Sequence, residues 1–134
     1  MAKGIVRKLD ELGRVVIPKE YRKSFGTTDR DPLGMLVENG VIHLVKAGPK
    51  FIGMVRNLDE LGRYTLPIET RRVLGLEIGQ KVDIYVDEFN DAICISKEGC
   101  HFCSGTEDLK EFKGTYICGD CLEEISSLQR GGHE

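Results

Sequence analysis

The chain has 134 residues, of which 40% are hydrophobic and 31% are charged, and its formal net charge is −3. It contains no run of about eighteen apolar residues, and its N-terminus has a basic start without an apolar stretch, so it predicts neither a membrane span nor a secretory signal. We therefore expect a cytoplasmic protein without a membrane partner, and the net charge alone disfavours nucleic acid as a partner.

The N-terminal segment predicts a β-hairpin followed by a short helix. Residues 4–8 are strand-like, residues 10–13 (DELG) are typical of a turn, and the β-branched residues 14–17 predict a second strand. Pro18 stands at the expected first helical position, and Gly26 is placed to end the helix in a left-handed conformation.

A second hairpin follows this helix. Residues 33–37 and 41–45 are mostly apolar and flank Asn39 and Gly40. The Asn-Gly pair is a strong signal for a two-residue type I′ turn. The order of elements is therefore β-hairpin, short helix, β-hairpin.

This unit occurs twice. Residues 4–26 recur as residues 53–75 with thirteen of twenty-three positions identical, including an unbroken LDELGR. Each copy has fewer than fifty residues, which is too few to bury an independent core. We therefore expect the two copies to share one core, and interpret Leu12, Leu61, Tyr21, Phe25, Val73 and Leu74 as parts of it.

The second copy ends in its own hairpin. Along residues 81–86, Val82, Ile84 and Val86 alternate with polar or exposed positions, and residues 92–96 provide a partner strand. Cys94 lies among apolar neighbours in this last strand. It is interpreted as a small buried hydrophobe.

The C-terminal part carries two Cys-x-x-Cys pairs. Cys100 and Cys103 are separated from Cys118 and Cys121 by fourteen residues. Four thiolates at this spacing favour one tetrahedral, structural zinc ion, and redox cysteines or an iron centre are the alternatives. His101 lies between two ligand cysteines and is predicted either to lie at the surface or to contact a ligand without binding the metal.

The strings VRKLDELGRVVIPKEYRKSFG and VRNLDELGRYTLPIETRRVLGLEIGQKVDIYVD resemble the swapped-hairpin DNA-binding domain of the AbrB and SpoVT transition-state regulators. In that family two copies, normally from two subunits, interleave their hairpins into one barrel. The resemblance implies a mostly β fold with short helices, here a pseudo-two-fold swapped-hairpin barrel within one chain. We expect repeats at 1–48 (the first copy) and 51–98 (the second copy).

The same resemblance implies that the chain binds duplex DNA through basic residues. The family's contacts correspond to Arg7, Lys8, Arg14, Arg22, Lys23, Arg56, Arg63, Arg71 and Arg72. Residues 1–26 carry a charge of +4 and residues 51–75 carry +1, whereas residues 76–99 and 100–134 carry −4 each. The positive charge thus lies in the duplicated units, although a merely solvated basic face is the alternative interpretation.

The strings CHFCSG and YICGDCLEEI resemble the N-terminal zinc-binding domain of the ClpX unfoldase, a small treble-clef-like fold that dimerises and docks partner proteins. The resemblance implies a zinc domain at 99–128, followed by a flexible tail at 129–134. It also implies a homodimer through this domain and a possible protein partner.

We find no catalytic motif, and a metal with four thiolate ligands has no open position for a substrate, so an enzyme is not expected. The sequence predicts a bacterial, nucleoid-associated transcriptional regulator, and the resemblance to AbrB and SpoVT implies that it binds A·T-rich promoter DNA. The alternatives are a MazE-like antitoxin and an adaptor that brings proteins to a proteolytic machine.

Overall fold

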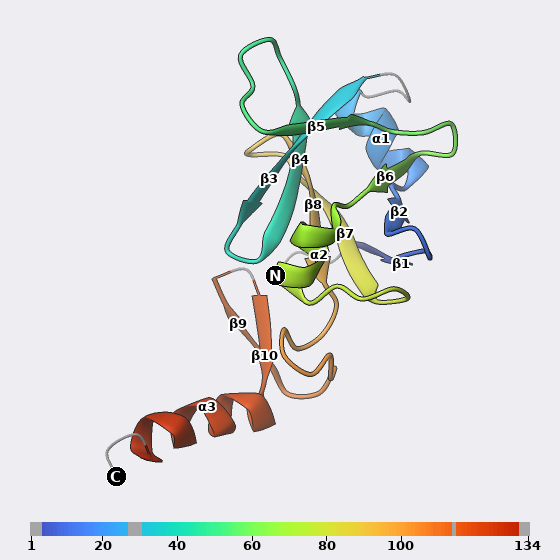
Figure 1. Ribbon diagram of the computed structural model, residues 1–134. Coiled ribbons are helices and arrows are strands. Elements are labelled where there is room, and N and C mark those ends of the chain that lie inside the picture. Colours follow the sequence, from blue (N-terminus) through green and yellow to red (C-terminus); the bar gives the residue numbers. More distant parts are fainter. Residues whose placement is uncertain (1–3, 27–30, 114, 132–134) are drawn as a thin grey trace.

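The computed structural model describes residues 4–26, 31–113 and 115–131 (Figure 1). The fold is mostly β with three short helices, as predicted. Its elements are β1 (Ile5–Lys8), β2 (Arg14–Val16), α1 (Lys19–Phe25), β3 (Pro32–Glu38), β4 (Val41–Lys46), β5 (Met54–Asn57), β6 (Arg63–Thr65), α2 (Ile68–Leu74), β7 (Lys81–Asp87), β8 (Ala92–Lys97), β9 (Leu109–Phe112), β10 (Thr115–Cys118) and α3 (Gly119–Gly131).

The two copies exchange their strands. The six-stranded sheet has the order β1-β7-β8-β4-β3-β5, and β2 pairs with β6 in a separate two-stranded ribbon. β1 of the first copy therefore pairs with β7 of the second, and β5 of the second copy pairs with β3 of the first. This order is unchanged when the copies are interchanged, so one chain forms the pseudo-two-fold swapped-hairpin barrel.

One detail of the first hairpin differs from the prediction. Residues 4–8 and 14–17 were expected to pair with each other, but β1 and β2 pair with β7 and β6. Strands of four and three residues form too small a hairpin to be stable alone. Pairing across the copies instead buries Val15 and Tyr64 against each other's strand.

The helices begin one residue later than predicted. Pro18 has ψ 140° and is the N-cap, so α1 begins at Lys19, and Pro67 caps α2 in the same way. The Pro18 carbonyl accepts the first helical hydrogen bond, from the amide of Arg22. Gly26 ends α1 at φ 74°, in the left-handed conformation that glycine adopts without cost.

The second hairpin of each copy forms as predicted. Asn39 and Gly40 both have positive φ, which is the geometry of a type I′ turn, and β3 pairs with β4 from Glu38 opposite Val41. β7 pairs with β8 across the 88–91 loop. In β7, Val82 and Ile84 are fully buried, while Val86 is half-buried.

The core is common to both copies. Its buried side chains are Leu9, Val15, Ile17, Phe25, Leu33, Ile42, Leu44, Leu58, Tyr64, Leu66, Leu74, Leu76, Val82, Ile84, Ile93 and Ile95, and Tyr21 packs against them. The predictions for Leu12, Leu61 and Val73 were wrong, because these side chains are 65%, 63% and 77% exposed. Leu12 and Leu61 lie at the tips of tight turns, and Val73 faces away from the buried side of α2.

The Cys module (residues 99–131) contains a cysteine loop, the β9–β10 hairpin and α3, and lies at the bottom of Figure 1. It contacts the second copy: Lys97 Nζ donates to the His101 carbonyl at 2.9 Å, and Ser104 Oγ lies 3.3 Å from Gln80 Oε1. The predicted flexible tail, 129–134, begins inside α3, and residues 132–134 lie outside the described residues.

Candidate nucleic-acid interface and metal centre

The β2·β6 ribbon places two of the predicted arginines on one face. Val15 and Tyr64 are opposite each other and buried, whereas Arg14 is opposite Thr65 and Arg63 is opposite Val16. Because side chains alternate along a strand, Arg14 and Arg63 lie on the outer face. The turns that precede β2 and β6 lie on the same side of the molecule in Figure 1.

Each ribbon arginine is fixed by the aspartate that begins its turn. Asp10 Oδ1 accepts the amides of Leu12 and Arg14, and Asp10 Oδ2 accepts Arg14 Nε at 2.8 Å. Partial burial raises the pKa of Asp10, but these hydrogen bonds with Arg14 and Leu12 outweigh it and lower the pKa. The carboxylate is therefore ionised at neutral pH and pre-orients the guanidinium.

The second copy repeats this arrangement. Asp59 Oδ1 accepts the amides of Leu61 and Arg63, and Asp59 Oδ2 accepts Arg63 Nε at 2.5 Å. In both copies the bond uses only Nε of the guanidinium. A guanidinium has five N–H donors, so the remaining ones can serve an external anion.

The helix arginines lie close to the same turns. Arg22 and Arg71 are half-buried, and their Nε atoms donate to the carbonyls of Ile17 and Leu66 at 3.0 and 3.1 Å. Their neighbours Lys23 and Arg72, also predicted contacts, are exposed in the last turn of each helix. Arginines from strands and helices of both copies are thus brought to the two turns at residues 10–13 and 59–62.

The remaining predicted contacts lie at the two edges of the large sheet. Arg7 and Lys8 are on β1, at one edge, and Arg56 is on β5, at the other edge. Burial raises the pKa of Tyr64 to about 12, and the charge of Arg56 opposes this effect. The Tyr64 hydroxyl donates to the Leu33 carbonyl of β3 at 3.0 Å, and Leu33 pairs with Arg56 of β5.

Two exposed leucines at the turns were not predicted as site residues. Leu12 and Leu61 each lie two positions before a ribbon arginine and are largely exposed. The identical LDELGR in both copies is the signal that could have identified them. An exposed leucine next to a pre-oriented arginine suits contact with a partly apolar surface such as a base edge or a sugar.

The four cysteines of the Cys module are brought together. Their sulfurs all lie within 4.8 Å of one another, and those of Cys103 and Cys118 are 3.6 Å apart. Tetrahedral coordination with metal–sulfur bonds of about 2.3 Å needs sulfurs separated by about 3.8 Å. The four sulfurs can therefore hold one metal ion, and they form no disulfide.

Backbone amides point at three of these sulfurs. Phe102, Gly105 and Cys121 donate N–H bonds of 3.4 Å to the sulfurs of Cys100, Cys103 and Cys118, respectively. Burial raises the pKa of Cys100, but backbone hydrogen bonds lower it to about 6. The hydrogen bond with Cys118 raises the pKa of Cys121, so holding all four as thiolates requires a cation.

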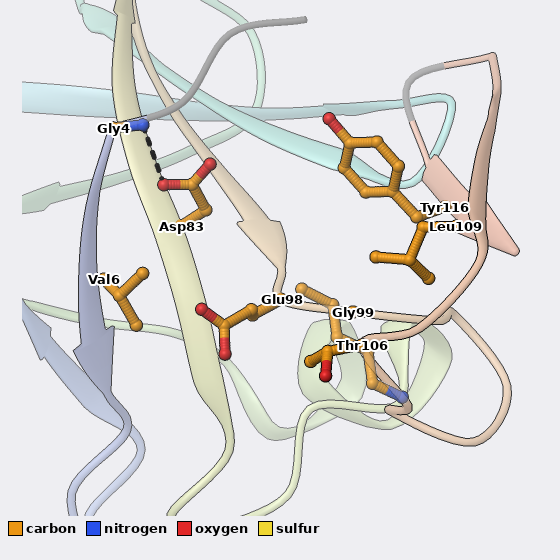
Figure 2. Close-up of a pocket in the computed structure, with 9 residues that line it drawn as sticks. Gly4, Val6, Asp83, Glu98, Gly99, Thr106, Leu109 and Tyr116 are labelled. Carbon is orange, nitrogen blue, oxygen red and sulfur yellow. Dashed lines mark hydrogen bonds between the residues drawn. The ribbon is translucent and has the colours of Figure 1, made fainter. Parts of the chain in front are cut away.

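A cavity of about 290 Å³ lies between the barrel and the Cys module (Figure 2). Asp83 and Glu98 line it from the barrel, and Leu109 and Tyr116 line it from the module. Asp83 Oδ1 accepts the amide of Gly4 at 3.0 Å, as the dashed line in Figure 2 marks. Lys97 also lines the cavity, but two carboxylates against one ammonium group make its wall net negative and unfavourable for phosphate, in contrast to the ribbon.

Residues 6–51 match the family model described as antidote-toxin recognition MazE, bacterial antitoxin. The first copy therefore has a domain similar to MazE. The match covers the swapped strands, the LDELGR turn and α1 of this copy.

Three proteins of Bacillus subtilis (strain 168) are similar to parts of this chain. Transition state regulatory protein AbrB is 52% identical over 46 residues (34% of this chain and 48% of AbrB). Stage V sporulation protein T is 49% identical over 49 residues (36% and 28%), and the putative transition state regulator Abh is 44% identical over 46 residues (34% and 50%). The chain spans at most half the length of these relatives.

No solved structure matches the chain with comparable significance. In the described part of the chain, the helices are too short or too polar to cross a membrane.

Proposed function

We propose that this protein is a DNA-binding transcriptional regulator of the AbrB and SpoVT type and not an enzyme. The observation that carries the proposal is the β2·β6 ribbon, on which Arg14 and Arg63 share one outer face and are each pre-oriented by an aspartate. The similarity to two transition-state regulators supports it.

A two-stranded ribbon has the right width to enter the major groove of duplex DNA. In this proposal Arg14 and Arg63 enter the groove, with the tips Leu12 and Leu61 beside them. The other predicted contacts neutralise phosphates on either side; these are Arg7, Lys8, Arg22, Lys23, Arg56, Arg71 and Arg72. Because most of these contacts reach the backbone, recognition depends on shape, which favours deformable A·T-rich promoter DNA.

The two halves of the interface would bind unequally. Lys8 of the first copy is replaced by Asn57 in the second, and residues 1–26 carry +4 where residues 51–75 carry +1. Each phosphate neutralised releases counterions and adds to affinity. We therefore expect the first copy to contribute more of the electrostatic attraction than the second.

The metal in the Cys module is proposed to be a structural zinc ion held by Cys100, Cys103, Cys118 and Cys121. Four thiolates favour zinc, and a closed site of this kind supplies folding energy and no catalysis. We propose that the module, at 99–128, joins two chains or docks a protein partner. Two joined barrels would bind neighbouring sites more tightly through effective concentration.

The central test is binding to A·T-rich duplexes over a range of salt concentrations, with wild type, Arg14→Ala, Arg63→Ala and the double variant. If about six to eight side chains neutralise phosphates, log affinity falls with log salt at a slope of roughly −5 to −7. Both single variants should bind more weakly and the double variant weakest. A slope near zero, or wild-type affinity in the double variant, would overturn the proposal.

The match of residues 6–51 to an antitoxin family favours one alternative, a MazE-like antitoxin. Such a protein would form a stable complex with a small toxin. Co-purification of a stoichiometric toxin together with a flat salt dependence would favour it, and an unfoldase bound through the Cys module would favour an adaptor.

A further inference from the structure

Arg22 on α1 and Arg71 on α2 have a contact that their role as phosphate ligands does not explain. Each is first anchored within its own copy, where Arg22 Nε donates to the Ile17 carbonyl and Arg71 Nε donates to the Leu66 carbonyl. The carbonyl that accepts this bond belongs to the anchor residue, which lies directly before the proline that caps the helix. It fixes where the guanidinium lies.

The guanidinium then lies against a glycine of the opposite copy. A Cβ built on Gly62 would be 2.5 Å from Cζ of Arg22, and a Cβ built on Gly13 would be 2.5 Å from Nε of Arg71. Both glycines are buried and have φ near +75°. The glycine at this turn therefore provides both the positive φ and the space that the arginine occupies.

The same turn is held by a main-chain bond from the anchor residue. The amide of Ile17 donates to the Gly62 carbonyl at 2.8 Å, and the amide of Leu66 donates to the Gly13 carbonyl at 2.9 Å. Ile17 thus accepts from the arginine of its own copy and donates to the turn of the other copy. The next residue after each glycine is a ribbon arginine, Arg63 or Arg14.

We infer that Arg22 and Arg71 are positioning residues that act across the copies: Arg22 holds the turn that presents Arg63, and Arg71 holds the turn that presents Arg14. The expected effect on DNA affinity rests on the proposed DNA-binding function, whereas the contacts themselves exist without DNA. The helix arginines thus have a structural contact in addition to any phosphate contact.

The chemistry of the contact explains why both copies carry arginine at this position. A planar guanidinium can donate through Nε and lie flat against a peptide, whereas a lysine ammonium has no planar group and a different reach. The next helix position is Lys23 in one copy and Arg72 in the other. At this neighbouring position, which needs only a positive charge, either lysine or arginine is therefore sufficient.

The test uses the full chain with Arg71→Lys, which keeps the charge, and Arg72→Lys as the matched control. The control introduces the residue that the first copy already has at the equivalent position. Without DNA, hydrogen exchange of the Leu66 amide should become faster in Arg71→Lys and stay unchanged in Arg72→Lys. Protected amides in β4 and β8 show that each variant is folded, and Arg22→Lys gives the mirror measurement at Ile17.

With DNA, Arg71→Lys should lose roughly tenfold or more in affinity, the size expected when a charge-assisted hydrogen bond is lost, and Arg72→Lys should lose much less. In double variants, the loss should be non-additive with Arg14→Ala in the opposite copy and additive with Arg63→Ala. Unchanged exchange at Leu66, or additive losses with Arg14→Ala, would overturn the inference. If the wild type does not bind DNA but Leu66 exchange becomes faster in Arg71→Lys, the proposed function is wrong and the positioning contact stands.

Discussion

The two copies have the same order of strands and helix but different surroundings. Both have the aspartate–arginine pair, the glycine turn and the capped helix. Only the second is followed directly by the Cys module, which bonds to Lys97 and Gln80 of that copy. The copies therefore share the turns and helix caps that hold them together. They differ in net charge and in the elements that surround them.

Metal removal should give the largest difference between the copies. A structural zinc ion contributes about 10–16 kcal/mol to folding in zinc-finger peptides, so chelation is expected to unfold the Cys module. Hydrogen exchange before and after chelation should show faster exchange in residues 97–131, with smaller changes near Gln80 and near Gly40, which lies against Thr115 of the module, and none in β2 or β6. Equal changes in both copies would show that the module supports the whole barrel.

Tyr64 and Val15 occupy equivalent positions in the two copies and pair with each other on the pseudo-two-fold axis. Tyr64→Ala should lower the free energy of unfolding by about 3–5 kcal/mol, because it removes a fully buried ring and a hydrogen bond to Leu33. Val15→Ala removes less apolar surface and should cost about 2 kcal/mol. Urea denaturation of both variants measures the difference, and a similar cost for both would contradict it.

Charge exchange between the copies tests the unequal interface. Asn57→Lys gives the second copy the residue that the first has as Lys8, and should raise DNA affinity several-fold and steepen the salt slope by about 1. Lys8→Asn should do the reverse. Salt titrations of both variants provide the measurement, and an effect from only one of the two would mean that β1 and β5 are not equivalent on DNA.

The smallest effect, and an equal one in both copies, is expected from acid. The pKa values of Asp10 and Asp59 are lowered when the chain folds, so their stabilisation is complete above the unfolded value near 3.8 and is lost as the pH falls through the lower folded-state value. These pairs are about one-third exposed, so each contributes at most about 1 kcal/mol. Asp10→Asn and Asp59→Asn should each flatten the acid limb of a stability–pH curve by the same amount.

Local patterns were enough to predict much of the fold and the site. The Asn39-Gly40 turn, the glycine that ends each helix and the four-cysteine cluster depend on residues near each other in the chain, so spacing and residue type predict them. The resemblance added the swapped-hairpin barrel and the basic residues. The exposed Leu12 and Leu61 were mistaken for core residues, because apolarity alone does not distinguish a turn tip from a buried strand end.

The amino-acid sequence alone determined that one unit occurs twice, with its turn, proline and arginines, and that four cysteines follow at metal-binding spacing. Only the tertiary structure decided that β1 and β2 pair with strands of the other copy, and that Arg22 and Arg71 reach the glycine turns across the pseudo-two-fold axis. The physical reason is that short strands have no stable partner nearby, so their pairing depends on which distant strands bury Val15 and Tyr64 in one common core.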